Sequence, residues 1–267
     1  MTGSEQLQVA FPEGRVALVP YLTAGYPTLE GAYEVGEAYV GAGVDVVEIG
    51  VPFSDPLADG PTIQGTTTLA LKNGADLGYC LALASHFADR VPVVLSVYYN
   101  SVFARGAKRF LDEAAGVGVS GLVIPDLPID EAAEFRTVAA ERRVAICPLA
   151  APTTTDERLD KISEAASGFV YCVSVAGVTG AREKLPCGAV ELLRRVRARV
   201  SVPVALGFGI SSAGAAVEAA SEADGVIIGS KLMQLVTEEG PEGAGAWLRE
   251  VRSALDHEAG VKVGSRD

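Results

Sequence analysis

Residues 45–64 of this 267-residue chain read DVVEIGVPFSDPLADGPTIQ and place one carboxylate inside an apolar run. The β-branched residues of the run predict a strand over Asp45–Gly50 that is buried on both faces. Because side chains alternate along a strand, Glu48 shares a face with Val46 and lies opposite Val47. Acids are rarely buried without a cationic partner. Glu48 is therefore either an ion-paired structural residue or a functional acid, and we favour the second interpretation.

Short apolar runs of this kind alternate with longer amphipathic stretches along the whole chain. Strands are predicted over Val16–Thr23, Asp45–Gly50, Val93–Tyr99, Gly121–Pro125, Val144–Pro148, Gly168–Ser174, Val204–Phe208 and Gly225–Ile228. Helices are predicted over Leu29–Ala42, Thr62–Leu71, Leu77–Ala88, Val102–Gly116, Ile129–Glu141, Thr155–Ala166, Cys187–Val200, Ser212–Ser221 and Ala244–Glu258. The alternation indicates a parallel sheet, and eight such units predict a closed (β/α)8 TIM barrel with its active site at the C-terminal ends of the strands.

We expect a single domain over residues 1–267, because no low-complexity linker or charge block divides the chain. It would comprise an irregular N-terminal segment over 1–15, the barrel over 16–258 and a tail over 259–267. With 22 Lys and Arg against 34 Asp and Glu, the net charge of −12 argues against binding to nucleic acid. No apolar run approaches the roughly 20 residues of a membrane span. The N-terminus does not resemble a signal peptide, so we expect a cytoplasmic protein without membrane attachment.

A second carboxylate lies in the loop that follows the Glu48 strand. Asp59 comes 11 residues after Glu48, and the three prolines of the loop stiffen its path. The loop can therefore present both carboxylates to one ligand, although Asp55 and Asp59 are also common residues in turns and helix caps. Inside a barrel the carboxyl of Glu48 loses water, which raises its pKa and suits it to general acid–base chemistry.

Three glycine-rich segments predict a phosphate site late in the chain. They are AGVTG at 176–180, GFGISS at 207–212 and GVIIGS at 225–230. Barrel enzymes often bind phosphate in the loops after strands seven and eight, through backbone N–H groups and a helix N-terminus. The six lysines fall in predicted helices, loops or the tail, so no Schiff-base lysine is expected, and the histidines and cysteines lack the spacing of a metal site. The sequence thus predicts carboxylate catalysis on a phosphate-bearing substrate.

Five motifs resemble the α subunit of tryptophan synthase, in order and at the spacing of that family, from about Val16 to Leu255. They are PYLTAG at 20–25, EIGVPFSDPLADGPTIQ at 48–64, PDLP at 125–128, AGVTG at 176–180 and GFGIS at 207–211. The resemblance implies a carbon–carbon lyase of tryptophan biosynthesis, which cleaves indole-3-glycerol phosphate to indole and glyceraldehyde 3-phosphate by a retro-aldol reaction.

The resemblance also implies roles for individual residues. Glu48 would be the general acid–base, and Asp59 would stabilise the positive charge that develops at the indole nitrogen. The residues implied around the substrate are Tyr171, Tyr21, Ile63, Tyr98, Phe208 and Thr179, and those implied at the phosphate are Gly180, Gly209, Gly229 and Ser230. Ordinary barrel packing remains an alternative for Tyr21, Ile63, Tyr98 and Phe208.

A partner is implied as well. Members of the family work as an α2β2 complex, in which the β subunit holds pyridoxal phosphate and the α chain binds no cofactor. Pro52, Asp55 and Asp126 match the face that meets the β subunit. Two positions depart from frequent family residues, since Val175 and Leu69 stand where arginines occur in other members.

Three other functions stay open from the sequence. The chain could be a stand-alone indole-releasing lyase of secondary metabolism with the same chemistry, or an inactive homologue kept as an interaction subunit. The intact Glu48 and Asp59 argue against the inactive homologue. A different phosphate-binding barrel isomerase would lack the run at 48–64.

Overall fold

The sheet of the protein is a ring of parallel strands. The computed structural model describes residues 1–173, 187–207 and 209–264. Its strands are β1 (Ala17–Thr23), β2 (Val47–Gly50), β3 (Val93–Ser96), β4 (Gly121–Val123), β5 (Ala145–Ile146), β6 (Leu149–Ala150), β7 (Val170–Val173), β8 (Val204–Gly207) and β9 (Gly225–Ile228). Their hydrogen-bonded order is β5-β4-β3-β2-β1-β9-β8-β7-β6, with every pairing parallel.

The two ends of this order, β5 and β6, are halves of the strand predicted over 144–148. Only Cys147 and Pro148 separate them. The Cys147 N–H donates to the Leu122 carbonyl on β4, and the Pro148 carbonyl accepts from the Tyr171 N–H on β7, both at 2.9 Å. Proline has no N–H, so a regular ladder cannot continue through it. The single bent strand closes the ring, which confirms the predicted (β/α)8 TIM barrel.

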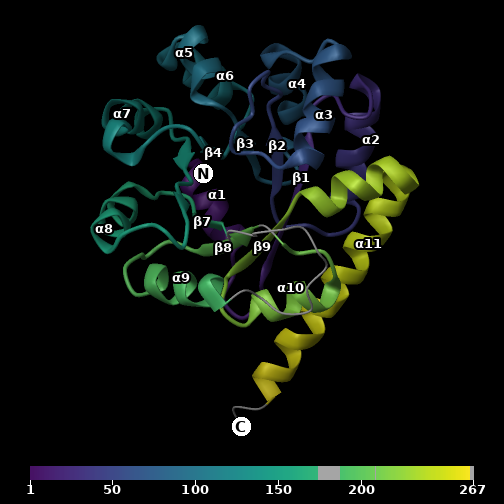
Figure 1. The fold of residues 1–267 in the computed structure, drawn as a ribbon, viewed down its shortest axis with the longest axis vertical. Helices are drawn as coiled ribbons and strands as arrows, with labels where there is room; N and C mark the ends of the chain where they lie inside the picture. The colour runs from purple at the N-terminus through teal and green to yellow at the C-terminus, as the bar shows by residue number, and fades with distance from the viewer. Residues whose placement is uncertain (174–186, 208, 265–267) are drawn as a thin grey trace.

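Helices surround the ring of strands (Figure 1). They are α1 (Gly3–Ala10), α2 (Leu29–Val40), α3 (Pro61–Lys72), α4 (Leu77–Ala88), α5 (Tyr99–Arg105), α6 (Ala107–Gly116), α7 (Ala133–Glu141), α8 (Asp156–Ala165), α9 (Cys187–Arg197), α10 (Ala213–Ala220) and α11 (Ser230–Gly264), with a 3-10 turn at Ile129–Glu131. Gly106, at φ 84°, divides the helix predicted over 102–116 into α5 and α6. None of the described helices is long and apolar enough to cross a membrane.

The last helix begins earlier and ends later than predicted. α11 starts at Ser230, bends at Gly240 (φ 74°) before Pro241, and continues to Gly264. The expected tail over 259–267 is therefore helical through residue 264. The bend makes the first segment of α11 a short helix that follows β9 directly.

The apolar core has two layers that the strands separate. The inner cluster fills the barrel and includes Val46, Val94 and Phe169. The outer cluster lies between the strands and the helices and includes Val47 and Ile49. The alternation predicted for β2 is thus confirmed, and the face that carries Val46 and Glu48 is the barrel interior.

The N-terminal segment was expected to be irregular, and this expectation was wrong. Residues 3–10 form helix α1. The Thr2 hydroxyl accepts from the Glu5 N–H and the Glu5 carboxylate accepts from the Thr2 N–H, which is a capping box. Leu7 on this helix and Phe11 just after it enter the inner cluster. The Gly3 N–H donates to a carbonyl that precedes β5, at 2.8 Å. α1 therefore closes the N-terminal end of the barrel.

Leu7 should contribute strongly to stability because its side chain is fully buried inside the barrel. We expect Leu7→Ala to lower the free energy of unfolding by about 2–5 kcal/mol, measured by urea denaturation. The matched control is Val9→Ala on the same helix, where the side chain is 68% exposed and the effect should stay within about 0.5 kcal/mol. Equal effects of the two substitutions would show that α1 does not close the barrel.

Candidate active site

A carboxyl group lies at the C-terminal mouth of the barrel, where β2 carries Glu48 into the interior. The residue is 4% exposed, and its Oε2 is buried without a hydrogen-bond partner. The pKa of Glu48 is raised to about 8, mainly because the carboxyl group is buried. A hydrogen bond with Ser96 on β3 lowers this pKa, and the nearby charge of Asp59 raises it. Glu48 is therefore mostly protonated at neutral pH, and its carboxyl group is poised to give up or take back a proton.

Two phenols lie beside this carboxyl group because neighbouring strands carry glycine where a side chain would block them. Tyr21 on β1 is the register partner of Glu48. A Cβ added to Gly50 would lie 2.0 Å from the Tyr21 hydroxyl, and one added to Gly207 would lie 2.4 Å from the Tyr171 ring. Burial, together with the charges of Glu48 and Asp59, raises the pKa of both tyrosines well above the ordinary value. Both phenols are therefore neutral hydrogen-bonding groups.

The loop between β2 and α3 brings Asp59 to the same mouth. The Tyr98 hydroxyl donates to Asp59 Oδ2 at 3.1 Å and accepts from the Ala58 N–H at 3.0 Å. Phe53 stacks on the Tyr98 ring with centroids 5.1 Å apart. Burial raises the pKa of Asp59, and the Tyr98 hydrogen bond opposes that rise. Tyr98 thus fixes the loop, and Asp59 remains the more acidic of the two carboxyl groups.

The other predicted substrate residues are only partly described. Ile63 is buried on the first turn of α3, next to the Asp59 loop. Thr179, Gly180 and Phe208 lie outside the described residues, as does Val175. Leu69, on the same helix as Ile63, is exposed at 40% and contributes nothing to the mouth.

Two helices begin beside the predicted phosphate glycines. Gly209 is exposed and has a φ of 86°, a conformation that favours glycine. Ser212 caps α10 by accepting from the Ala215 N–H at 3.1 Å. Ser230 is the first residue of α11, and Gly229 before it lies against Tyr21. Because β8 and β9 are neighbours, these N-termini face the same edge of the mouth and can receive an anion there.

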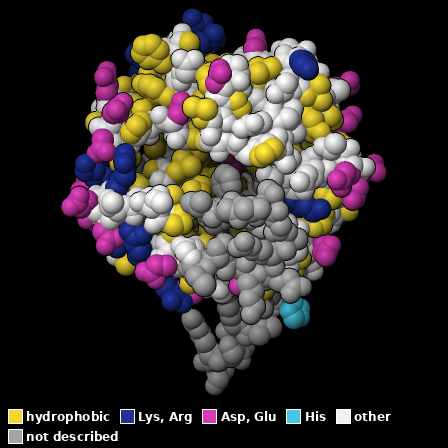
Figure 2. Space-filling model, viewed as in Figure 1, with side chains coloured by type: hydrophobic (Ala, Val, Ile, Leu, Met, Phe, Trp, Pro, Cys, Tyr) yellow, Lys and Arg dark blue, Asp and Glu magenta, His cyan; other side chains and the backbone are white. Residues whose placement is uncertain are grey.

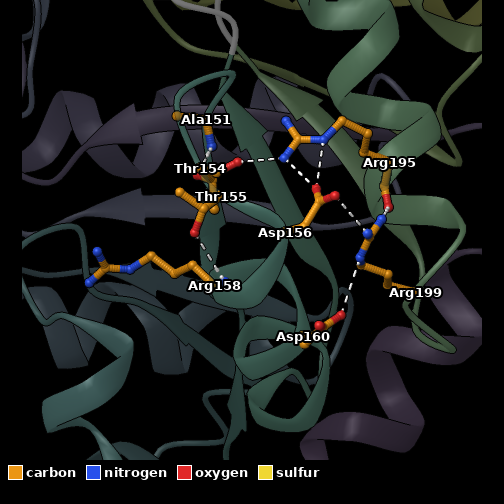
Figure 3. A network of polar contacts seen from close by, with 8 residues as sticks. All are labelled: Ala151, Thr154, Thr155, Asp156, Arg158, Asp160, Arg195 and Arg199. Atoms are coloured by element: carbon orange, nitrogen blue, oxygen red, sulfur yellow. Dashed lines mark hydrogen bonds and ion pairs between the residues drawn. The ribbon is translucent and has the colours of Figure 1, made fainter.

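A network of charges fixes the loop that leaves β6 (Figure 3). Arg195 on α9 donates to the Thr154 carbonyl at 2.6 Å and to Asp156 at 2.7 Å. Arg199 pairs with Asp156 and with Asp160 on α8. Isolated surface pairs contribute little. Here both arginines bind acidic residues in the first turns of α8, and Arg195 also binds the loop carbonyl. The loop after the bent strand is therefore held against α9.

A separate cavity of about 350 Å³ opens between α7 and α8. Figure 2 shows hydrophobic side chains gathered around a hollow on this face. Leu127, Phe135 and Ile162 line the cavity, with Asp126 and Arg136 among its polar residues. Neither Glu48 nor Asp59 belongs to its lining, so this cavity is distinct from the candidate active site.

Comparisons with known proteins agree with this geometry. The family model described as "Tryptophan synthase alpha chain" matches residues 7–261. The tryptophan synthase alpha chain of Methanopyrus kandleri is 49% identical over 223 residues, which cover 83% of this chain and 81% of that protein. The alpha chain of Xanthomonas axonopodis pv. citri is 45% identical over 252 residues, 91% of this chain and 94% of that protein.

The chain belongs to the tryptophan synthase alpha chain family. Solved structures of the family share its fold. The alpha subunit from Legionella pneumophila superposes with a TM-score of 0.88 at 30% identity, covering 96% of this chain and 99% of that one. Tryptophan synthase from M. tuberculosis gives a TM-score of 0.87 at 36% identity, over 94% and 98% of the two chains. The family expected from the motifs is confirmed.

Sequence reasoning missed two groups in this alpha-chain site. Ser96 lies one strand away from Glu48, on the interior face of β3, and its alternation with Val94 could have indicated that face. Phe53 stacks on Tyr98, a contact that no sequence pattern indicates because it joins the loop after β2 to the segment between β3 and α5.

The protonation of Glu48 predicts a specific dependence of stability on pH. Its pKa of about 8 in the folded chain lies above the ordinary 4.5, so the folded chain binds more protons than the unfolded chain between these values. The contribution of Glu48 to stability therefore falls as pH rises through this window. We expect Glu48→Gln to gain stability relative to the parent from pH 5 to 8, by no more than about 1.4 kcal/mol per pH unit.

The measurement is urea denaturation of both proteins at each pH. Glu134 is an exposed acid on α7, so the free energy of unfolding of Glu134→Gln should change with pH in the same way as that of the parent. A Glu48→Gln curve that also runs parallel to the parent would show that Glu48 ionises normally.

Proposed function

We propose that Glu48 and Asp59 carry out the retro-aldol cleavage of indole-3-glycerol phosphate to indole and glyceraldehyde 3-phosphate, the lyase reaction of this family. The observation that carries this assignment is a buried, mostly protonated carboxyl group beside a second carboxyl group that stays more acidic. Carboxyl groups whose environments separate their pKa values can take different roles in one reaction. No finding favours the alternative of a stand-alone lyase of secondary metabolism.

In this mechanism Glu48 begins as the acid. Its proton goes to C3 of the indole ring, which leaves a positive charge on the ring nitrogen. The carboxylate of Glu48 then takes the proton of the C3′ hydroxyl as the C3–C3′ bond breaks, which releases indole and the aldehyde and restores the acid. Asp59 accepts a hydrogen bond from the ring N–H and stabilises the positive charge, an electrostatic role.

The remaining residues are proposed to hold the substrate. Tyr171, Tyr21, Ile63 and Tyr98 line the mouth around the two carboxyl groups and would contact the heterocycle and glycerol chain, with Phe208 and Thr179. Gly209, Gly229 and Ser230, with Gly180, would bind the phosphate through backbone N–H groups and a hydroxyl. Gly229 lies against Tyr21, which makes the anion site continuous with the mouth.

A β subunit is proposed as the partner, in an α2β2 complex in the cytoplasm. Pyridoxal phosphate would belong to that subunit, and this chain would need no cofactor. The loop over 51–60 supports a docking role because it exposes Leu57 at 93%, and the neighbouring helix α5 exposes Phe103 at 72%. Asp55 and Asp126 are exposed on the same rim, and Asp126 accepts from the Tyr99 N–H at 2.7 Å. Pro52 is buried and would shape the loop rather than touch the partner.

Removing the acid should abolish catalysis and spare binding. We expect Glu48→Gln to lower indole release from indole-3-glycerol phosphate by at least about 100-fold, because general acid–base groups contribute on that scale. Affinity for a phosphate ligand such as glycerol phosphate, measured by calorimetry, should change by less than a few-fold. Glu134→Gln serves as the exposed control. Near-normal turnover of Glu48→Gln would remove Glu48 from the mechanism.

The proposed partner surface predicts that a substitution there weakens binding to the partner without changing the turnover of the isolated chain. Leu57→Ser should leave the turnover of the isolated chain unchanged and weaken binding to a tryptophan synthase β subunit by at least about 1 kcal/mol. Indole release is measured with and without that subunit, and Val9→Ser at the opposite end of the barrel is the control. High turnover of the isolated chain with no increase on adding the β subunit would favour the stand-alone lyase instead.

A further inference from the structure

Asp59 is held separately at its main chain and at its carboxylate. Its N–H donates to the Pro56 carbonyl at 3.1 Å, and its carbonyl accepts from the side-chain amide of Gln64 at 2.9 Å. These two bonds fix the backbone at the end of the β2–α3 loop. The carboxylate is fixed by a different group, because its Oδ2 accepts from the Tyr98 hydroxyl at 3.1 Å. Among the described residues, Tyr98 is therefore the contact that sets how this carboxylate is turned.

Both the hydroxyl and the ring of Tyr98 are bound to the same loop. A phenol has one proton, which here goes to Asp59, and the phenol oxygen accepts from the Ala58 N–H at 3.0 Å. The Phe53 ring stacks on the Tyr98 ring at an interplanar angle of 23°. Among the described residues, none donates to Asp59 Oδ1, so this oxygen is left to accept from a ligand.

A third segment holds the peptide group that follows Tyr98. Asp126, in the loop after β4, accepts from the Tyr99 N–H at 2.7 Å. That N–H and the Tyr98 carbonyl belong to one planar group, so the bond helps to fix the ψ angle of Tyr98, which is 137°. The carbonyl accepts from the Ser101 N–H within α5, at 3.0 Å. Asp126 is therefore the contact that ties this peptide group to a distant part of the chain.

The charges around Tyr98 keep its hydroxyl a donor. Burial raises the pKa of Tyr98, and the charges of Asp59 and Asp126 raise it further, so the phenol keeps its proton. The charge of Asp59 also acts on titratable groups from three strands, which are Tyr21 on β1, Glu48 on β2 and Tyr171 on β7. These groups remain in place in every variant of Tyr98 or Asp126 considered below.

We propose that Asp126 is a positioning residue for Asp59, and that it acts through the Tyr98–Tyr99 peptide group and the Tyr98 hydroxyl. Asp126 holds the backbone of Tyr98, Tyr98 holds Asp59 Oδ2, and Oδ1 is left to accept from the ring N–H of the substrate. The resemblance to the family implies only a partner contact for Asp126, whereas this hydrogen bond gives it a role within the chain. The inference rests on the proposed role of Asp59 at the ring nitrogen.

The titration of Asp59 tests the proposal without substrate. The aspartate carboxyl carbons are isotope-labelled and followed by NMR against pH, and the Asp59 signal is the one missing from Asp59→Asn. The hydrogen bond from Tyr98 lowers the pKa of Asp59, so Tyr98→Phe should raise the titration midpoint by about one pH unit. Asp126→Ala releases the peptide group after Tyr98 and should raise the midpoint in the same direction, by about half a pH unit.

A conservative variant separates the hydrogen bond of Asp126 from its charge. Asp126→Asn keeps an oxygen that accepts from the Tyr99 N–H and should hold the parental midpoint. Loss of a negative charge alone would lower the midpoint, so a rise in Asp126→Ala cannot come from the charge. In the Tyr98→Phe background, Asp126→Ala should have no further effect. A rise that persists in that background, or no rise when Tyr98 is intact, would overturn the proposal.

The neighbouring tyrosine provides a matched control. Tyr99→Phe removes a hydroxyl one residue away and keeps the N–H that donates to Asp126. The Tyr99 ring lies against Phe103 and Phe135, with centroids 6.4 Å and 6.0 Å away. Tyr99→Phe should therefore keep the parental midpoint of Asp59. A shift as large as that of Tyr98→Phe would contradict the proposal.

The outcome is distinguishable from failure of the proposed function. The midpoint reports the protonation of Asp59 with no reaction taking place, and indole release by Asp59→Asn tests the catalytic role separately. If Asp59→Asn kept normal turnover while the cycle behaved as expected, the positioning role would stand and the catalytic role would fall. If Asp59→Asn lost turnover while the cycle showed no coupling, the catalytic role would stand and the positioning role would fall.

Discussion

The loss of water around one carboxylate is the constraint on which the rest of this structure depends. β2 carries Glu48 into a closed barrel, where no cation pairs with it among the described residues and one oxygen has no hydrogen-bond partner. A charge in such a place is costly, and the group responds by keeping its proton at neutral pH. Burial therefore keeps Glu48 protonated and ready to transfer its proton.

Residues at the N-terminal end of the barrel stabilise the fold, whereas residues at the C-terminal end form the candidate active site. At the N-terminal end, α1 supplies Leu7 and the interior is filled with apolar side chains. At the C-terminal end, glycines on β2 and β8 replace side chains and leave room for the phenols of Tyr21 and Tyr171. Because Glu48 and the two phenols lie at the open end, the apolar interior below them is left intact. This arrangement is what a TIM barrel permits, since its active site lies at the ends of the strands.

The sequence predicted the parts of the fold that depend on local pattern. Alternation along β2 was enough to place Glu48 inside, and the predicted helix Leu77–Ala88 has the bounds of α4. α1 was missed because its apolar periodicity is weak, although Thr2 and Glu5 have the spacing of a capping box.

Contacts between distant segments could not be predicted from the local pattern of the sequence. The bend at Pro148 and the stacking of Phe53 on Tyr98 depend on which segments become neighbours in the fold. Local periodicity contains no information about those pairings. It can place Ser96 on the interior face of β3, but it cannot show that Glu48 is a neighbour.

The most direct test of the account is a crystal structure of Glu48→Gln with indole-3-glycerol phosphate bound. If Glu48 and Asp59 act on one substrate, a single ligand touches both carboxyl positions, with its ring N–H on Asp59 and the side chain at position 48 between C3 and the C3′ hydroxyl. Its phosphate should lie on the N–H groups near Gly209 and Ser230. A ligand that binds away from position 48, or a phosphate held at another edge of the barrel, would contradict it.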